Sequence, residues 1–300
     1  MPRMRALVLA GGGAAGNAWE LGLLAGLADA GLDVTDADVV IGTSAGSTVA
    51  AQVTSGSPLA ELYAAVLAES APSRPAGREG QAGPARGSGP ARGVTGGAYL
   101  DWSNDVIAAA SDPADMRRRM GAAALERMGS DDSGTSRWRD VVASRLPGSR
   151  WPDRWVLIAA VDARTGEPVV FDRDSGVDLV DAVAASTSAM TPYRIGERWY
   201  LNGGYRRSEN ADLAAGCERV LVLSPFGGRS RMPAAWGMDL ATQVRQLREA
   251  GSRVETVFPD AGAGAVFDAN ALDPSNRPQA ARGGFEQGRS LAATLAVLWR

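Results

Sequence analysis

Two short apolar segments, each followed at once by a glycine-rich turn, limit most strongly what this chain can fold into. Residues 6–10 (ALVLA) lead into Gly11-Gly12-Gly13-Ala14-Ala15-Gly16, and residues 39–41 (VVI) lead into Gly42-Thr43-Ser44-Ala45-Gly46. Residues compatible with a helix follow each turn, at about 18–30 and 47–53. Strands that alternate with helices in this way favour a parallel sheet with helices packed on its faces. We therefore predict an α/β domain with a mostly parallel central sheet.

The rest of the chain extends this pattern. Apolar runs predict strands at 154–161, 168–171, 198–201 and 219–223, and helices are predicted at 103–110, 113–128, 137–145, 234–249 and 278–298. In the last helix, Leu291, Leu295 and Leu298 form part of a stripe that faces the core. We expect one domain over residues 1–300.

Residues 71–98 interrupt the pattern, because they consist mainly of Gly, Pro, Ala, Ser and Arg with almost no large apolar side chains. Such a segment cannot bury enough surface to offset the entropy of ordering it. We interpret it as a flexible insertion, with a lid or a membrane-contacting segment as the alternative.

The ionisable residues exclude several classes of site. The net charge is −3 and the pI about 5.2, so the strong basic bias of nucleic-acid-binding proteins is missing. The chain has no His and no Lys, which rules out a Ser-His-Asp triad, a Ser-Lys dyad and His-based zinc sites within it. A single cysteine, Cys217, excludes intrachain disulfides and Cys-ligated clusters. We expect no metal and no organic cofactor.

The N-terminus resembles a secretory signal only superficially. Arg3 and Arg5 precede the apolar run 6–10, but this run is too short and three glycines end it. No apolar stretch reaches the ~20 residues that a membrane-spanning helix needs. We expect a cytoplasmic protein, with peripheral, transient contact to a membrane surface as an open alternative. The sequence does not indicate an oligomeric state.

The segment Gly42-Thr43-Ser44-Ala45-Gly46 fits the pattern G-x-S-x-G between a strand and a helix. In this context the pattern is typical of a nucleophile elbow, a sharp turn that tolerates only small neighbours and exposes the serine Oγ. The structural alternative is a tight glycine turn whose serine caps the next helix. We predict that Ser44 is a nucleophile.

Acyl transfer also requires hydrogen-bond donors for the oxyanion that develops in the transition state. The loop Gly11-Gly12-Gly13 supplies candidate N–H groups, and Ala45, directly after the nucleophile, supplies another. In a parallel sheet the two glycine motifs end neighbouring strands and lie side by side. The same loop fits G-x-G-x-x-G, typical of dinucleotide binding. That use requires an acidic residue about 20 positions on, at the end of a second strand, but here the second strand leads into the serine motif.

A serine hydroxyl needs a base, and without His and Lys the main choice left is a carboxylate. This reasoning leads to Leu201-Asn202-Gly203-Gly204-Tyr205, which follows the predicted strand 198–201. Glu209 and Asp212 lie close to Asn202 in sequence. Either is an alternative base, although nothing in the sequence brings them near Ser44.

Taken together, these motifs resemble a bacterial patatin-like phospholipase. That family has a G-G-G-x-x-G loop, a G-x-S-x-G elbow and a D-G-G/A motif in this order, matched here at Gly11 to Gly16, Gly42 to Gly46 and Asn202-Gly203-Gly204. Residues 184–192 (AASTSAMTP) are similar to a small-residue segment of the family. The resemblance covers about residues 5–213, with a looser similarity to residue 300. It implies a three-layer α/β/α fold and a Ser-Asp dyad that works without histidine.

The chain departs from the family pattern in two of the motifs. Asn202 stands where the family has its catalytic aspartate, and an amide cannot accept the serine proton at neutral pH. Ala14 and Ala15 stand where the family often has a basic residue, which leaves the oxyanion site to backbone donors. General-base catalysis is typically worth roughly 10²–10⁴-fold, so we expect impaired activity.

Three functions remain open at this point. The first is a serine acyl hydrolase of the lipid esterase or phospholipase A type, with Ser44 as nucleophile and residue 202 in the base position. The second is a catalytically inactive patatin-like protein that binds a lipid or a partner. The third is a nucleotide-binding Rossmann protein, suggested by the glycine loop alone. The first two imply a lipid or other acyl ester as ligand, and none implies a nucleic acid.

Overall fold

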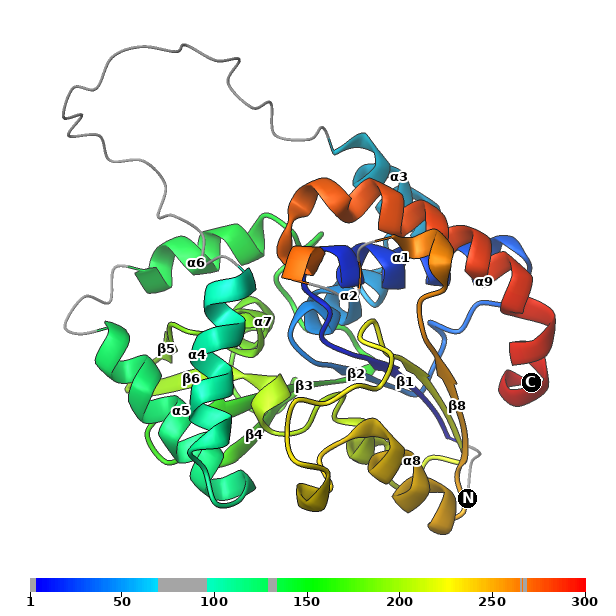
Figure 1. The fold of residues 1–300 in the computed structure, drawn as a ribbon. Helices are drawn as coiled ribbons and strands as arrows, with labels where there is room; N and C mark the ends of the chain where they lie inside the picture. The colour runs from blue at the N-terminus through cyan, green and yellow to red at the C-terminus, as the bar shows by residue number, and fades with distance from the viewer. Residues whose placement is uncertain (1–3, 70–95, 129–133, 265, 267–268) are drawn as a thin grey trace.

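The computed structural model describes residues 4–69, 96–128, 134–264, 266 and 269–300. One mixed sheet runs through them, with the strand order β5-β6-β3-β2-β1-β7-β8 and with β4 paired to β3 (Figure 1). Its strands are β1 (Arg5–Leu9), β2 (Val39–Gly42), β3 (Trp155–Asp162), β4 (Pro168–Phe171), β5 (Tyr193–Ile195), β6 (Arg198–Asn202), β7 (Arg219–Leu223) and β8 (Arg253–Val257).

The central part of the sheet is parallel. Strands β3, β2, β1, β7 and β8 are successive parallel neighbours, whereas β6 and β4 run antiparallel to β3, and β5 antiparallel to β6. In the β1–β2 pair, Leu9 lies opposite Gly42. The two glycine motifs therefore leave the same edge of the sheet from neighbouring strands. The predicted mostly parallel α/β fold is confirmed.

Alternating side chains of the strands pack on the two helical layers. In β1, Leu7 and Leu9 belong to the core beneath the first layer, and Ala6 and Val8 to the core beneath the second. The first layer comprises α1 (Gly13–Asp29), α2 (Ala45–Val53), α3 (Leu59–Ala68), α6 (Gly134–Ala143), α7 (Leu179–Thr187) and α9 (Arg277–Trp299). Helices α1 and α9 lie side by side (Figure 1), and the indole N–H of Trp19 donates to Gln287 across them.

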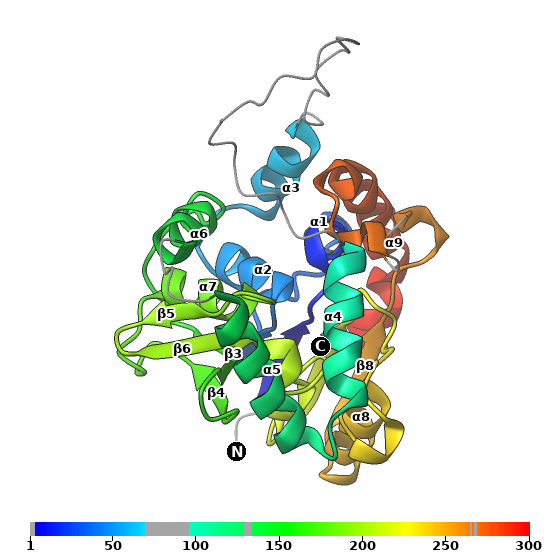
Figure 2. The same cartoon turned by 60° about the vertical axis from the view of Figure 1, so that its left-hand side comes forward.

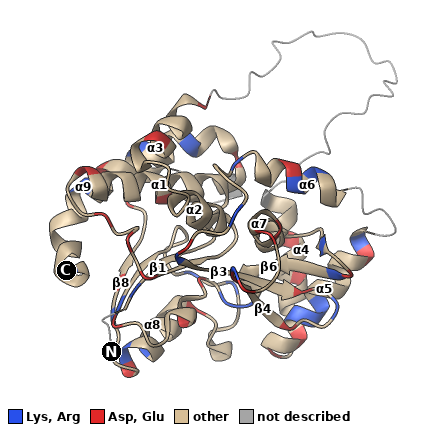
Figure 3. Cartoon of the chain, turned by 180° about the vertical axis from the view of Figure 1, so that it is seen from behind, with Lys and Arg blue, Asp and Glu red and all other residues tan. Residues whose placement is uncertain are grey.

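The second layer consists of two separate parts. Helix α8 (Leu240–Glu249) covers the β1–β7–β8 half of the sheet, and α4 (Gly96–Ala108) with α5 (Pro113–Met128) covers the β3–β6 half. Figure 2 shows α5 in front of β3, with α4 beside α5. Charges of both signs are interspersed on the outer helices, for example on α6 and α9 (Figure 3).

Most elements that the sequence predicted are present. The bounds of α5, β4 and β7 agree with the prediction, whereas α1 begins at Gly13 rather than near residue 18. The predicted helix at 234–249 is a 3-10 turn (Ala234–Trp236) followed by α8. Helices α3 and α7 and strands β5 and β8 were not predicted from the sequence.

The predicted insertion at 71–98 falls mainly outside the described residues. Only its last three residues, 96–98, are described, and they form the start of α4 instead of continuing the insertion. None of the described helices combines the length and the apolar composition that crossing a membrane requires.

Candidate active site

Ser44 lies on a sharp turn between β2 and α2, with φ 52° and ψ −123°. A positive φ is unfavourable for a residue with a Cβ atom, and a nucleophile elbow holds its serine in this kind of strained conformation. The backbone N–H of Ser44 donates to Ser186 Oγ at 2.9 Å, which links the turn to α7. Ser44 itself is partly exposed, so its hydroxyl is not sealed in the core.

The glycines of the elbow are required by close backbone contacts. A Cβ atom on Gly46 would lie 2.2 Å from the carbonyl oxygen of Leu9, in the neighbouring strand β1. A Cβ atom on Gly42 would lie 2.6 Å from Ser47 Cα. Any side chain at either position would therefore move α2 away from the sheet and displace Ser44.

The glycine loop after β1 lies against the elbow. A Cβ atom on Gly11 would come within 3.2 Å of Ser44 Cβ. Gly12 packs on Pro225, and Gly13, with φ 64°, begins α1 beside the backbone of Ala271. The expected adjacency of loop and serine is confirmed. The assignment of the Gly12, Gly13 and Ala45 N–H groups as oxyanion donors stays a prediction.

Asn202, the last residue of β6, completes the site from the antiparallel side of the sheet. Its side-chain Nδ2 donates to Ser44 Oγ at 2.9 Å, and its Oδ1 accepts the N–H of Gly204 at 2.9 Å. Its backbone N–H donates to Ser188 O at 2.7 Å. The predicted contact between residue 202 and Ser44 is confirmed, and Ser186 and Ser188 brace the two sides of it.

Gly203 allows this approach, because a Cβ atom there would lie 2.2 Å from the carbonyl oxygen of Ala159 in β3. The Gly204 N–H then points back to the amide of Asn202. The Asn202-Gly203-Gly204 motif therefore holds the side chain of residue 202 in one orientation toward Ser44. Asn202 is largely buried, with 8% of its surface exposed, so bulk water offers little competition for these bonds.

The two nearby carboxylates do not take the base position. Asp212 forms a bidentate ion pair with Arg206, with N–O distances of 2.9 and 2.8 Å. The buried Glu209 carboxylate accepts hydrogen bonds from the hydroxyls of Ser208 and Ser224. Burial raises the pKa of Glu209 to about 6, and the two hydroxyl hydrogen bonds oppose this shift. The side chain that meets Ser44 Oγ is the amide of Asn202.

A guanidinium group lies beside the glycine loop, although Ala14 and Ala15 bring no charge there. Arg277 donates to Ala14 O at 3.2 Å and to Asn17 Oδ1 at 2.7 Å, and it forms an ion pair with Glu69. Asn17 Nδ2 in turn donates to the carbonyl oxygen of Ala45 at 3.3 Å. Sequence reasoning missed this link, because Arg277 and Asn17 are 260 positions apart and belong to no motif.

Two surface cavities lie away from the Ser44–Asn202 pair. One, of about 410 Å³, is lined mainly by α9, and the other, of about 440 Å³, lies between α8 and the turn at Gly227-Gly228. Neither is lined by Ser44 or Asn202. Within the described ranges, no three Cys, Asp or Glu side chains are grouped as a metal site would require.

The sequence of this chain matches a known protein family. A family model described as patatin-like phospholipase matches residues 7–215, which is more than half of the chain. A search of curated proteins found no significant match.

Solved structures also align with the chain. VipD from Legionella pneumophila is 13% identical with a TM-score of 0.46, over 98% of this chain and 67% of that one. The type III effector protein ExoU is 16% identical with a TM-score of 0.35, over 96% of this chain and 54% of that one. At these values no residue role is transferred from either structure.

Proposed function

The chain belongs to the patatin-like phospholipase family, and on this premise we propose that it is a serine acyl hydrolase of lipid esters, with Ser44 as nucleophile and residue 202 in the base position. The observation that carries the proposal is the 2.9 Å hydrogen bond between the side chains of residues 202 and 44. It joins the last residue of a strand to a strained serine turn that is 158 positions away in sequence.

In the proposed reaction Ser44 Oγ attacks the ester carbonyl carbon and gives up its hydroxyl proton. The ester C–O bond then breaks, and the alcohol leaves with that proton on its oxygen. Water then hydrolyses the acyl-Ser44 ester and releases the acid. The developing oxyanion lies next to Gly11 and Ala45, where the backbone N–H groups of the glycine loop and the elbow are the proposed donors. The side-chain Nδ2 of Asn17 donates to the carbonyl oxygen of Ala45 and so helps to position Ala45.

Residue 202 limits this reaction. In a Ser-Asp dyad a carboxylate oxygen accepts the serine proton. Here the Oδ1 of Asn202 accepts from Gly204, and its Nδ2 presents an N–H donor to Ser44 Oγ in place of an acceptor. The amide therefore preserves the geometry of a dyad and lacks its proton acceptor. We propose that the protein, with Asn202 in place of an aspartate, hydrolyses esters slowly.

The alternative is an inactive patatin-like protein that binds a lipid or a partner with the same site. The same donor N–H of Asn202 favours it, because Ser44 Oγ is occupied as a hydrogen-bond acceptor. For either function we propose an acyl lipid as the ligand and peripheral contact with a membrane surface in a cytoplasmic protein, with no cofactor.

A panel of acyl esters and phospholipids tests the proposal with four chains: the unsubstituted protein, Asn202→Asp, Ser44→Ala and the double variant of the two substitutions. We expect Asn202→Asp to hydrolyse at least one substrate roughly 10²–10⁴-fold faster than the chain as given, because the substitution adds a proton acceptor without changing the shape. The double variant Asn202→Asp/Ser44→Ala should lose the gain. If Asn202→Asp is as inactive as Ser44→Ala on the whole panel, the hydrolase function is wrong and the binding function replaces it.

A further inference from the structure

Asn210 shares a positive φ with Ser44, but of the two only Asn210, with ψ 31°, lies in the left-handed helical region. Among the described residues other than glycine, only Ser44 and Asn210 have a positive φ, of 52° and 58°. Asn210 is also completely buried. Asparagine tolerates this left-handed region better than most residues, but the conformation still has to be stabilised by the surroundings. A buried residue in such a conformation near a reactive turn calls for a functional explanation.

The side-chain amide of Asn210 joins the two segments that carry the expected dyad. Its Nδ2 donates to Thr43 Oγ1 at 3.0 Å and to Gly203 O at 3.0 Å. Thr43 is bonded directly to Ser44, and Gly203 directly to Asn202. One NH2 group thus spans the elbow after β2 and the turn after β6.

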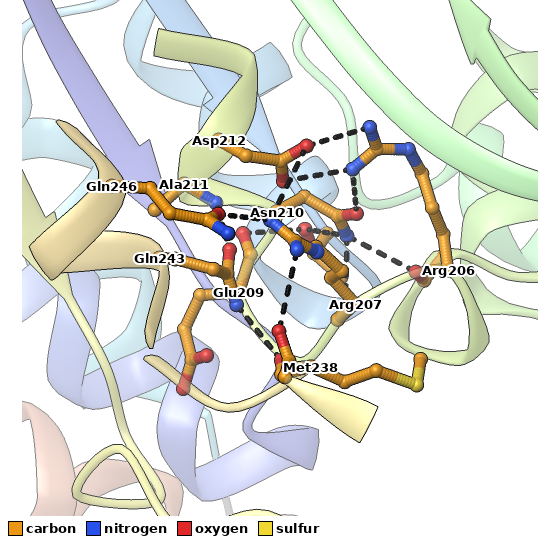
Figure 4. A network of polar contacts seen from close by, with 12 residues as sticks. Arg206, Arg207, Glu209, Asn210, Ala211, Asp212, Met238, Gln243 and Gln246 are labelled. Atoms are coloured by element: carbon orange, nitrogen blue, oxygen red, sulfur yellow. Dashed lines mark hydrogen bonds and ion pairs between the residues drawn. The ribbon is translucent and has the colours of Figure 1, made fainter. Parts of the chain in front are cut away.

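Further contacts fix the orientation of this amide. Asn210 Oδ1 accepts from Arg206 Nη1 at 2.8 Å, and Arg206 is itself held by Asp212 (Figure 4). Since arginine can only donate, the Oδ1 atom must face Arg206 and the Nδ2 atom must face Thr43 and Gly203. Thr43 Oγ1 uses its own proton on Glu209 O at 3.1 Å, which leaves its lone pair for Asn210.

The surrounding segment is anchored to the second helical layer. Gln243 of α8, completely buried, accepts the N–H of Ala211 at 2.7 Å and donates to Met238 O at 3.0 Å. Figure 4 shows Gln243 and Met238 on one side of Asn210, and Arg206 with Asp212 on the other. The backbone next to Asn210 is thus anchored to α8 through Ala211, and the Asn210 side chain is anchored to Arg206.

We propose that Asn210 is a positioning residue for the dyad: by linking Thr43 to Gly203, its amide keeps the side chain of residue 202 in contact with Ser44 Oγ. The expected effect of Asn210 on the reaction rate rests on the proposed function. Its expected effect on the contact between residues 202 and 44 does not. Misplacing reacting groups by about 1 Å can cost about 10²-fold in rate. Nothing in the spacing of the motifs indicates this role.

The test uses three variants. Asn210→Gly keeps the left-handed conformation accessible and removes the amide, whereas Thr43→Val is nearly isosteric and removes only the hydroxyl. The matched control is Arg207→Met in the same segment, whose side chain contacts Gln246 Oε1, Gly237 O and, at 3.8 Å, the Asp212 carboxylate, but not the elbow.

The first readout needs no catalysis. Protein labelled with ¹⁵N-asparagine gives a side-chain NH2 signal for Asn202, identified by its loss in Asn202→Asp. We expect this NH2 group to exchange at least 10-fold faster with solvent in Asn210→Gly and in Thr43→Val, and at an unchanged rate in Arg207→Met. Unchanged exchange in a folded Asn210→Gly or Thr43→Val protein would overturn the proposal. If Asn210→Gly does not fold, Thr43→Val alone decides.

The second readout is kinetic, in the Asn202→Asp background. Asn210→Gly should lower kcat about 10²-fold with little change in KM, while Arg207→Met changes neither. Equal losses in both variants would show a general effect on stability and overturn the proposal. If no variant hydrolyses any ester while the NH2 exchange still responds, the proposed hydrolase function fails and the positioning role of Asn210 stands.

Discussion

The side-chain amide of Asn202 donates a hydrogen bond to Ser44 Oγ at 2.9 Å, so the serine oxygen is an acceptor in this contact. A general base would have to do the reverse and accept the serine proton. The distance is that of a reactive pair, and the direction of the bond is the opposite of what nucleophilic attack requires. One atom, the Nδ2 of Asn202, causes this reversal, because an aspartate would have an acceptor oxygen in its place.

A fluorophosphonate probe should report the reactivity of Ser44 independently of any substrate. We expect labelling of the chain as given to be roughly 10²–10⁴-fold slower than labelling of Asn202→Asp, because only the latter has a proton acceptor at the serine. Ser44→Ala should not be labelled at all. Rapid labelling of the chain as given, measured by intact-mass spectrometry over time, would show that Asn202 does not limit the nucleophile.

Gly46→Ala should destabilise the protein. The added methyl group would lie 2.2 Å from Leu9 O, so either α2 or β1 has to move. Overpacking of this kind typically costs about 1–3 kcal/mol in the free energy of unfolding. The control is Gly97→Ala near the start of α4, where the new methyl group meets nothing within 4 Å, so no overpacking loss is expected. Urea unfolding of both variants measures the difference.

Glu209 should make stability depend on pH. Its pKa is raised by burial from the usual 4.5 to about 6. Between these values the unfolded chain ionises before the folded one does, so stability falls as pH rises through this window and is lowest above it. Each pH unit of pKa difference corresponds to about 1.4 kcal/mol, which gives a loss of about 2 kcal/mol.

Glu209→Gln should remove this loss, because the amide can still bond to the hydroxyls of Ser208 and Ser224. We therefore compare the free energy of unfolding of the variant with that of the unsubstituted protein. The difference should be about 2 kcal/mol more favourable to the variant at pH 7.5 than at pH 4.5, as measured by urea unfolding at the two pH values. A stability difference that does not vary with pH would show that Glu209 keeps its ordinary pKa in the folded protein.

Replacing Glu20 with an apolar residue should stabilise the protein. Its side chain on α1 is completely buried, and neither carboxyl oxygen has a hydrogen-bond partner. Burial raises its pKa well above the usual value, and the nearby amide of Ala10, which itself bonds to Leu223 O, opposes this only in part. Glu20→Met should raise the free energy of unfolding at pH 7 by about 1–3 kcal/mol, since an unsatisfied polar group is removed.

The control for Glu20 is Glu61→Met on the exposed face of α3, which should change stability by less than about 0.5 kcal/mol. Thermal unfolding at several pH values separates the two cases. A loss of stability in Glu20→Met would indicate that the carboxyl group has a polar partner in solution.

The Asn202-Gly203 bond should resist deamidation while the protein is folded. Free Asn-Gly sequences cyclise readily because glycine leaves its backbone nitrogen accessible. Here both amide atoms of Asn202 are hydrogen-bonded and Gly203 is packed against Ala159 O. Mass spectrometry of the peptide carrying residue 202 should show deamidation at least 10-fold slower in native than in urea-unfolded protein. Equal rates would show that this turn opens freely.

Local pattern was sufficient for the framework of the site. The apolar runs and glycine turns indicated β1, β2 and both turns, because a strand followed by a sharp glycine turn depends on neighbouring residues alone. The sequence also located Ser44 and Asn202, since both lie in short motifs. It missed α7, whose small Ala and Ser residues lack a helical apolar stripe, and β8, whose alternating Arg253–Val257 is short and partly exposed.

Only the tertiary structure decided what surrounds the pair. It brought Asn210 between Thr43 and Gly203, and it placed Arg277 beside Ala14 and Asn17. It also pairs Asp212 with Arg206, and Glu209 with the hydroxyls of Ser208 and Ser224. The side chain that contacts Ser44 Oγ is therefore that of Asn202. Such partners are chosen by the pairing of strands and the packing of helices over long separations in sequence. The sequence by itself therefore determined the residues of the reactive turn, and the fold determined their hydrogen bonds.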